Sequence, residues 1–329
     1  MKKFETALYL TLTLTLLNLA FVIFMFSPLH KGQNSKDEFK LDPIAEDLSH
    51  FDNKFAEITE MPLAYTTDVK VPERISFASE EVPLHRIDVV ESFRKELIVN
   101  TYLHSHSLQI MHKAPRFFAI IEPILKEEGV PDDFKYLAVI ESSLYPLAVS
   151  PAGAAGIWQF MEGAAREFNL EVGRGIDERY NLEKATRAAT RYLKKAYEHF
   201  GSWTTTAAAY NAGRGQLNKR LADQKVTNYY DLMLNEETGR YVFRILALKQ
   251  IMTHPQLYNF SVQDTYPIEE TTRVQVNTSI GNLVDFAKEH HISLKTLKRF
   301  NPWLRENDLK NPLRKSYEIL IPVHTHLYE

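Results

Sequence analysis

The chain has 329 residues, of which 44% are hydrophobic and 25% are charged, and its formal net charge is −3. This length allows more than one domain, and the composition is that of an ordinary globular protein without the basic excess typical of nucleic-acid binding. We therefore expect no nucleic-acid partner. The chain contains no cysteine, which excludes disulfides, thiolate metal sites and a lipid-modified N-terminal cysteine.

The N-terminus predicts a membrane anchor over residues 1–30. Lys2 and Lys3 precede an uncharged apolar run, residues 7–29, which is long enough to cross a bilayer. The two lysines should stay in the cytoplasm, so that the rest of the chain lies outside it. The alternative is a cleaved signal peptide, but the run is long for one and no A-x-A-like cleavage site follows. Residues 31–85 are polar and without a sustained period, and we expect them to form a linker with a short ordered part near its end.

Residues 86–262 are predicted to form one all-α domain. Apolar residues recur at steps of three and four through residues 181–200, and Gly201 then ends the helix. A second amphipathic helix covers residues 237–254 and is stopped by Pro255.

Glu141 lies within an apolar run in a helix predicted over about residues 132–143. Residues three, four and seven apart share one face of a helix, so Glu141 shares its face with Phe134, Leu137 and Ala138. Burying an unpaired carboxylate is unfavourable, which makes this residue a candidate general acid with a raised pKa. Taken alone, such a Glu is more often a boundary residue that reaches solvent.

Two further segments carry groups that suit a sugar polymer. Residues 150–160 contain two glycines that permit close backbone approach, and residues 207–213 end a helix of small residues. Together they supply neutral hydrogen-bonding groups and aromatic faces, although such aromatics are individually more often core residues and such an Asn a helix cap. The candidate substrate-binding residues are Ser150, Trp158, Gln159, Tyr210 and Asn211.

No metal site or cofactor is expected from the sequence. His104 and His106 are two residues apart, so on a helix they do not share a face, and no third ligand accompanies them. The chain also lacks the G-x-S-x-G motif of a serine nucleophile.

Residues 268–325 differ in pattern and are predicted to form a separate β-α-α-β module. Short strands are expected near residues 274–276 and 317–323, and two short helices over about 283–290 and 294–300. Because this module holds no acid on an apolar face, we expect it to serve retention on a surface and not chemistry.

Several motifs in order resemble the lytic transglycosylases with a lysozyme-like fold, and among them the membrane-bound lytic murein transglycosylase D family. The matching stretches are residues 136–161, 176–193, 207–213 and 237–249. The resemblance implies a mainly α protein: a lysozyme-like transglycosylase domain, a LysM-like module and an N-terminal transmembrane helix.

The C-terminal module resembles a LysM domain, a small glycan-binding fold, through residues 292–304 and 319–322. It departs from the LysM pattern in two loops. The usual Gly-Asp-Thr-Leu opening is replaced by residues 277–280, and no Gly-Gln precedes the last strand. Since those loops help to form the sugar groove, the LysM fold is better supported than sugar binding.

The same resemblance implies that Glu141 is both acid and base in cleaving peptidoglycan between MurNAc and GlcNAc, and that the product carries a 1,6-anhydro ring. Ser150 and Gln159 match the family's hydrogen-bonding residues, and Tyr210 its active-site tyrosine. The implied partners are peptidoglycan strands and, through the N-terminal helix, the membrane. The implied location is the bacterial envelope, with the catalytic domain facing the periplasm.

Two alternatives remain open at the level of the sequence. A hydrolytic muramidase needs a second carboxylate, for which Asp177 and Glu162 are candidates, although both lie in polar stretches. A catalytically inactive wall-binding protein is the other alternative, but it would have no need to keep Glu141, Gln159 and Tyr210.

Overall fold

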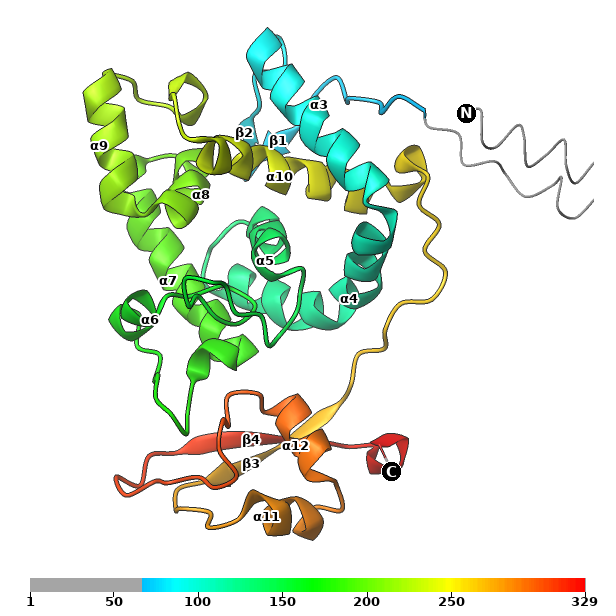
Figure 1. Ribbon diagram of the computed structural model, residues 1–329, viewed down its shortest axis with the longest axis vertical. Coiled ribbons are helices and arrows are strands. Elements are labelled where there is room, and N and C mark those ends of the chain that lie inside the picture. The colour runs from blue at the N-terminus through cyan, green and yellow to red at the C-terminus, as the bar shows by residue number, and fades with distance from the viewer. Residues whose placement is uncertain (1–66, 329) are drawn as a thin grey trace, which may run out of the picture. The chain divides into compact units, whose positions relative to one another are not determined.

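The structure is a computed structural model that describes residues 67–328, and it consists of a helical domain followed by a small strand-containing module (Figure 1). The predicted anchor, residues 1–30, lies outside the described residues. Within residues 67–328, no helix is both long enough and apolar enough to cross a membrane.

The helical domain confirms the prediction of an all-α region. Short 3-10 segments, such as Asp132–Phe134 and Glu178–Tyr180, connect several of its helices. The α-helices are α3 (Ile87–Tyr102), α4 (His104–Glu127), α5 (Lys135–Ser142), α6 (Glu162–Glu167), α7 (Leu182–Phe200), α8 (Trp203–Ala212), α9 (Arg214–Gln224) and α10 (Glu236–Thr253).

Helix α7 follows the predicted pattern closely. Its buried residues, which include Ala185, Ala189 and Leu193, fall on one face. The side chain of Asn181 accepts a hydrogen bond from the backbone of Lys184 and caps the first turn. The helix ends at Gly201, whose φ of 67° is the left-handed conformation that glycine adopts without strain.

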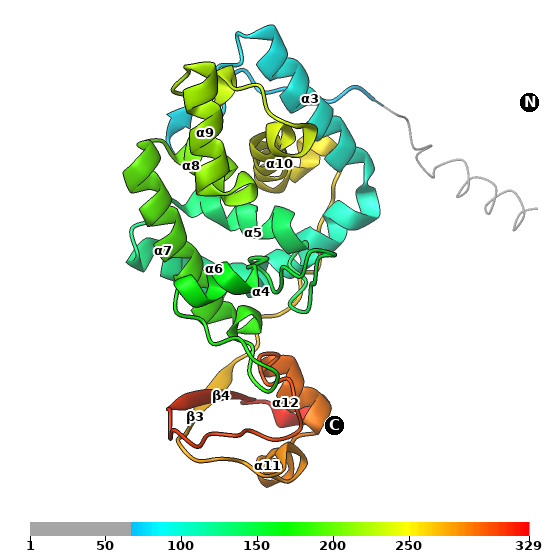
Figure 2. The same cartoon turned by 60° about the vertical axis from the view of Figure 1, so that its left-hand side comes forward.

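Helix α10 has neighbours on several sides within the helical domain. It packs against α3, α5 and α8, and the two views show it lying among them (Figures 1 and 2). Its buried residues fall on more than one face, as expected for a helix with neighbours on several sides. They are Thr238, Tyr241, Val242, Phe243, Ile245, Leu246, Ala247, Leu248, Gln250 and Ile251.

The residues just before α3, at the end of the predicted linker, are ordered and belong to the helical domain. Strands β1 (Ser76–Phe77) and β2 (Glu80–Glu81) form a small hairpin, and the ring of the buried Phe77 lies 5.1 Å from that of Phe134. The carboxylate of Glu80 accepts hydrogen bonds from the backbone of Trp203 at 2.5 Å and of Thr204 at 2.9 Å. An acid at a helix N-terminus is stabilising, so Glu80 fixes this segment to the start of α8.

The C-terminal module has the predicted β-α-α-β order. Strands β3 (Thr271–Val276) and β4 (Tyr317–Pro322) pair antiparallel, and α11 (Leu283–Glu289) and α12 (Leu294–Phe300) lie between them in the chain. Its hydrophobic cluster also contains three residues of the helical domain, Ala155, Ile176 and Tyr180. The module is therefore packed against the helical domain, whereas the sequence suggested a separate unit.

Candidate active site

Glu141 occupies the last turn of α5, on the face that the sequence predicted. Phe134, Leu137 and Ala138 on the same face are fully buried, while Glu141 keeps a partly exposed side chain. The helix ends just after it, because Ser143 adopts a left-handed conformation with a φ of 51°. The predicted helix over 132–143 is thus a 3-10 turn followed by α5.

The carboxyl group of Glu141 has a neutral partner. The hydroxyl of Tyr241 in α10 donates a hydrogen bond to its Oε1. Burial raises the pKa of Glu141 to about 7, although the hydrogen bond from Tyr241 and the charge of Arg244 act to lower it, and the charge of Glu237 adds to the rise. Glu141 can therefore hold a proton near neutral pH, as a general acid requires.

Sequence reasoning did not assign a role to Tyr241. It lies in the segment 237–249 that carried the family resemblance, and it is only 2% exposed. A buried tyrosine hydroxyl needs a hydrogen-bond partner. This requirement is the signal by which the sequence could have marked Tyr241 as a candidate. The identity of that partner depends on how α10 packs against α5.

Ser150 and Gln159 shape the loop between α5 and α6. The hydroxyl of Ser150 accepts a hydrogen bond from the backbone of Ala154 at 3.0 Å. The side-chain amide of Gln159 donates to the carbonyls of Ala148 at 3.2 Å and Gly156 at 2.8 Å. Both side chains remain partly exposed, so each can also reach a ligand.

The two glycines of this loop share a backbone conformation, but only Gly156 lies against another segment. Gly153 and Gly156 both have positive φ, 85° and 78°, which favours glycine. At Gly156 the close approach is to protein: a Cβ there would lie 2.0 Å from the carbonyl oxygen of Arg179. The loop therefore packs closely against the backbone of the segment that contains Arg179.

Tyr210 joins this loop to α8. Its hydroxyl donates to the carbonyl of Trp158 at 2.8 Å, and its side chain is partly exposed. The negative charge of Glu141 adds to the effect of burial in raising the pKa of Tyr210 well above its usual value. Tyr210 therefore lies close enough to Glu141 for the charge of the carboxylate to act on its hydroxyl.

Trp158 does not present a face to a ligand, which corrects the sequence-based expectation. Its side chain is 0% exposed, and its indole N–H donates to the hydroxyl of Thr186 at 2.9 Å. It contributes to the core beneath the loop, because its large apolar surface is better buried there than in water.

Asn211 bridges α8 and α10. Its Oδ1 accepts from the hydroxyl of Thr238 at 2.8 Å, and its Nδ2 donates to Glu237 at 3.3 Å. Asn211, Tyr210 and Gln159 line one cavity of about 610 Å³. Three of the expected substrate-binding residues thus meet at a single hollow, which is of the size that small ligands occupy.

The two other acids considered from the sequence are engaged elsewhere. Asp177 forms a salt bridge with Arg179 at 2.7 Å, and Glu162 forms one with Arg166 at 2.8 Å. The acid whose charge does reach Glu141 is Glu237, which the sequence reasoning missed. Across residues 67–328 the structure contains no group of three or more His, Cys, Asp or Glu that could hold a metal ion.

Comparison with known families identifies two domains. Residues 118–233 match the Transglycosylase SLT domain, and residues 272–325 match the Soluble lytic transglycosylase C-terminal LysM-like domain.

Curated relatives match over part of their length. The chain is 30% identical over 224 residues to the membrane-bound lytic murein transglycosylase D of Escherichia coli strain K12, which covers 67% of this chain and 48% of that protein. It is 31% identical over 123 residues to the soluble lytic murein transglycosylase of Salmonella typhimurium strain LT2, covering 35% of this chain and 19% of that protein. The chain therefore spans about half the length of the first relative.

Among solved structures, the 70 kDa soluble lytic transglycosylase of Escherichia coli aligns with 22% sequence identity and a TM-score of 0.36. The alignment covers 45% of this chain and 26% of that one.

Proposed function

We propose that this chain, which contains a transglycosylase SLT domain followed by a LysM-like domain, is a peptidoglycan lytic transglycosylase. It would cleave the MurNAc-β-1,4-GlcNAc bond without water and leave 1,6-anhydro-MurNAc ends. The observation that carries the proposal is the carboxyl group of Glu141, buried beside a neutral tyrosine hydroxyl and with a pKa raised to about 7.

In the proposed reaction Glu141 acts twice. In its protonated form it donates to the glycosidic oxygen, which leaves with GlcNAc while positive charge develops at C1 of MurNAc. Glu141 is then a carboxylate and accepts the proton of the C6 hydroxyl of the same sugar. The C6 oxygen attacks C1 and closes the anhydro ring, so Glu141 regains its proton and no water is consumed.

Tyr241 fits this cycle because it donates to the carboxyl oxygen of Glu141. A hydrogen bond to a charged acceptor is stronger than one to a neutral acceptor. The hydroxyl therefore stabilises the carboxylate that forms after the first proton transfer. We expect the substrate sugars to contact Ser150, Gln159, Tyr210 and Asn211, three of which line the shared cavity.

A hydrolytic muramidase is the second candidate, and one observation favours it. Glu237 is close enough for its charge to act on Glu141, so a second carboxylate is present to activate water. Glu237 is exposed and accepts a hydrogen bond from Asn211. It is therefore a weaker candidate for a catalytic acid or base than Glu141.

Mass spectrometry of the muropeptides released by the purified chain without residues 1–30 distinguishes the two reactions. Anhydro-MurNAc ends are expected, whereas reducing MurNAc ends would establish hydrolysis. If neither product accumulates and the protein still sediments with sacculi, the chain is a wall-binding protein and the proposal is wrong.

We also propose that the protein is anchored in the bacterial envelope through residues 1–30. Support comes from the apolar run at residues 7–29 and from the membrane-bound relative. Cell fractionation tests this: full-length protein should remain with membranes, and recovery of an N-terminally shortened soluble protein would indicate a cleaved signal peptide.

A further inference from the structure

The C-terminal module is joined to the helical domain by backbone pairing. Ile176 and Leu304 form an antiparallel bridge. The backbone N–H of Asp177 donates to the carbonyl of Trp303, and that of Arg305 donates to the carbonyl of Gly175, both at 2.9 Å. A module that only tethered the enzyme to a surface would need no such pairing with residues 171–180.

Apolar contacts extend this interface to the candidate substrate loop. Ile176, Tyr180 and Ala155 are all buried in the hydrophobic cluster of the module. The guanidinium of Arg305 lies 4.2 Å from the ring centre of Tyr180, a cation–π contact. Ala155 belongs to the loop over residues 150–160, so the hydrophobic cluster that contains the core of the module extends to the loop that bears Ser150 and Gln159.

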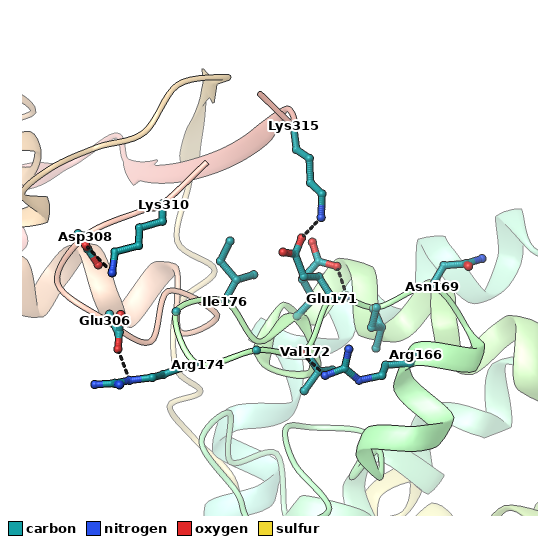
Figure 3. A pocket seen from close by; sticks show the side chains of 14 residues that line it. Arg166, Asn169, Glu171, Val172, Arg174, Ile176, Glu306, Asp308, Lys310 and Lys315 are labelled. Carbon is teal, nitrogen blue, oxygen red and sulfur yellow. Dashed lines mark hydrogen bonds and ion pairs between the residues drawn. The ribbon is translucent and has the colours of Figure 1, made fainter. Parts of the chain in front are cut away.

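Charged side chains from both sides surround an adjacent cavity of about 940 Å³ (Figure 3). Arg174 pairs with Glu306 at 2.6 Å, and Lys315 pairs with Glu171 at 2.9 Å. The hydroxyl of Tyr317 also donates to Glu171 at 3.0 Å. Such solvent-exposed pairs contribute little stability individually, but they favour one orientation of the module on residues 171–180.

Arg179 connects this interface to the substrate loop. Its Nη2 and Nε bond the two carboxylate oxygens of Asp177 at 2.7 and 2.9 Å, a bidentate pair. Its Nη1 donates to the carbonyls of Gly153 at 2.9 Å and Phe160 at 3.2 Å. Since the carbonyl of Arg179 also lies against Gly156, the loop is held by both the side chain and the backbone of this residue.

We propose that Arg179 is a positioning residue for the substrate loop and that the C-terminal module is the support that holds it in place. The contacts run from Trp303 and Leu304 of the module through residues 175–180 to the loop with Ser150 and Gln159. The module then belongs to the catalytic unit, in contrast to the retention role expected from the sequence. The kinetic part of this inference rests on the proposed function, but the structural part does not.

The test replaces Arg179 in the chain without residues 1–30. In Arg179→Gln the amides of residues 153–160 should exchange with solvent about tenfold faster, and kcat/KM on short soluble glycan fragments should fall by about tenfold or more, because small misplacements of binding groups have large effects on rate. Arg179→Lys should recover part of the rate, since lysine can donate to one carbonyl but cannot form the bidentate pair. Arg187→Gln, which removes the ion pairs with Glu127 and Glu128, should change neither quantity.

A second pair of variants tests the module itself. Leu304→Ala removes a buried contact at the bridge, whereas Leu283→Ala removes an equally buried one at the start of α11. Only Leu304→Ala should speed exchange in residues 153–160 and lower kcat/KM on soluble fragments. If Arg179→Gln and Leu304→Ala stay folded with unchanged loop exchange, the inference is wrong. If the unmodified chain releases no glycan product while both substitutions still speed amide exchange in residues 153–160, that result would contradict the proposed function, but it would support the inference that the module and Arg179 hold the loop.

Discussion

Two acids of the helical domain, one buried and one partly exposed, are contacted in different ways by neighbouring residues of α10. Glu96 of α3 is 1% exposed and forms a salt bridge with Arg240 at 2.6 Å. Glu141 of α5 instead receives a hydrogen bond from the hydroxyl of Tyr241. One carboxylate thus has a full counter-charge, whereas the other has a neutral donor.

This difference distinguishes an acid with a compensated charge from an acid that is suited to proton transfer. The charge of the buried Glu96 carboxylate is compensated by the guanidinium of Arg240. A carboxyl group that is buried beside a neutral hydroxyl is held near its protonated form, and its pKa of about 7 allows it to give and regain a proton. The comparison leads to four predictions.

The largest effect is expected for Glu141→Gln. The amide keeps the shape of the side chain but cannot transfer a proton, so cleavage of purified sacculi should fall by about 10²–10⁴-fold. Turbidity loss measures the rate, and near-ultraviolet circular dichroism serves as the check that the fold is intact. A well-folded variant that clears sacculi at the unmodified rate would exclude Glu141 as the acid.

Breaking the structural pair should affect stability strongly. Arg240→Met leaves Glu96 buried without its counter-charge and should lower the free energy of unfolding by about 3 kcal/mol, the lower end for broken buried pairs, because the Arg240 side chain is itself 35% exposed. Urea denaturation measures the change.

Two controls accompany this substitution. Combining Arg240→Met with Glu96→Gln removes both charges and should restore most of the stability. Arg74→Met breaks only the exposed pair with Glu81 and should have an effect of less than about 1 kcal/mol. Equal decreases in the free energy of unfolding in Arg240→Met and Arg74→Met would contradict the prediction, because they would show that the buried Glu96 does not need the counter-charge of Arg240.

The raised pKa of Glu141 also predicts how stability depends on pH. Below pH 4.5 the carboxyl is protonated in the folded and unfolded states, whereas between 4.5 and about 7 only the unfolded state ionises, so folding stability falls as pH rises. The rise in pKa from 4.5 to about 7 corresponds to at most about 3 kcal/mol.

Glu141→Gln removes this dependence. The variant should therefore be more stable than the unmodified chain at pH 8, with a smaller difference at pH 4, as measured by urea denaturation at the two pH values. A difference that does not change with pH would mean that the carboxyl is not held protonated by burial.

The smallest effect is expected for Tyr241→Phe, which removes the hydrogen bond to Glu141. Because that bond favours the carboxylate, its loss should raise the pKa of Glu141 further and move the alkaline limb of the pH–rate profile to higher pH. The maximal rate should fall about tenfold, as expected for a lost hydrogen bond to a charged group. An unmoved alkaline limb would contradict the assigned role of Tyr241.

The sequence by itself determined the local elements and the position of the acid. The three- and four-residue periodicity predicted α7 and α10, the apolar neighbours of Glu141 predicted its placement, and the alternation near residues 274–276 predicted a strand. These features depend on residues close in the chain, so they can be derived from spacing alone.

Only the tertiary structure decided the partners of these residues. Tyr241 follows Glu141 by 100 positions, and no periodicity predicts that α10 would bring the two together. For the same reason, the sequence does not show that Phe77 and Glu80 complete the helical domain, and it predicts Trp158 as a substrate-binding residue although its side chain lies in the core. Burial and long-range pairing are properties of the packed chain, and they decide which carboxyl group holds a proton.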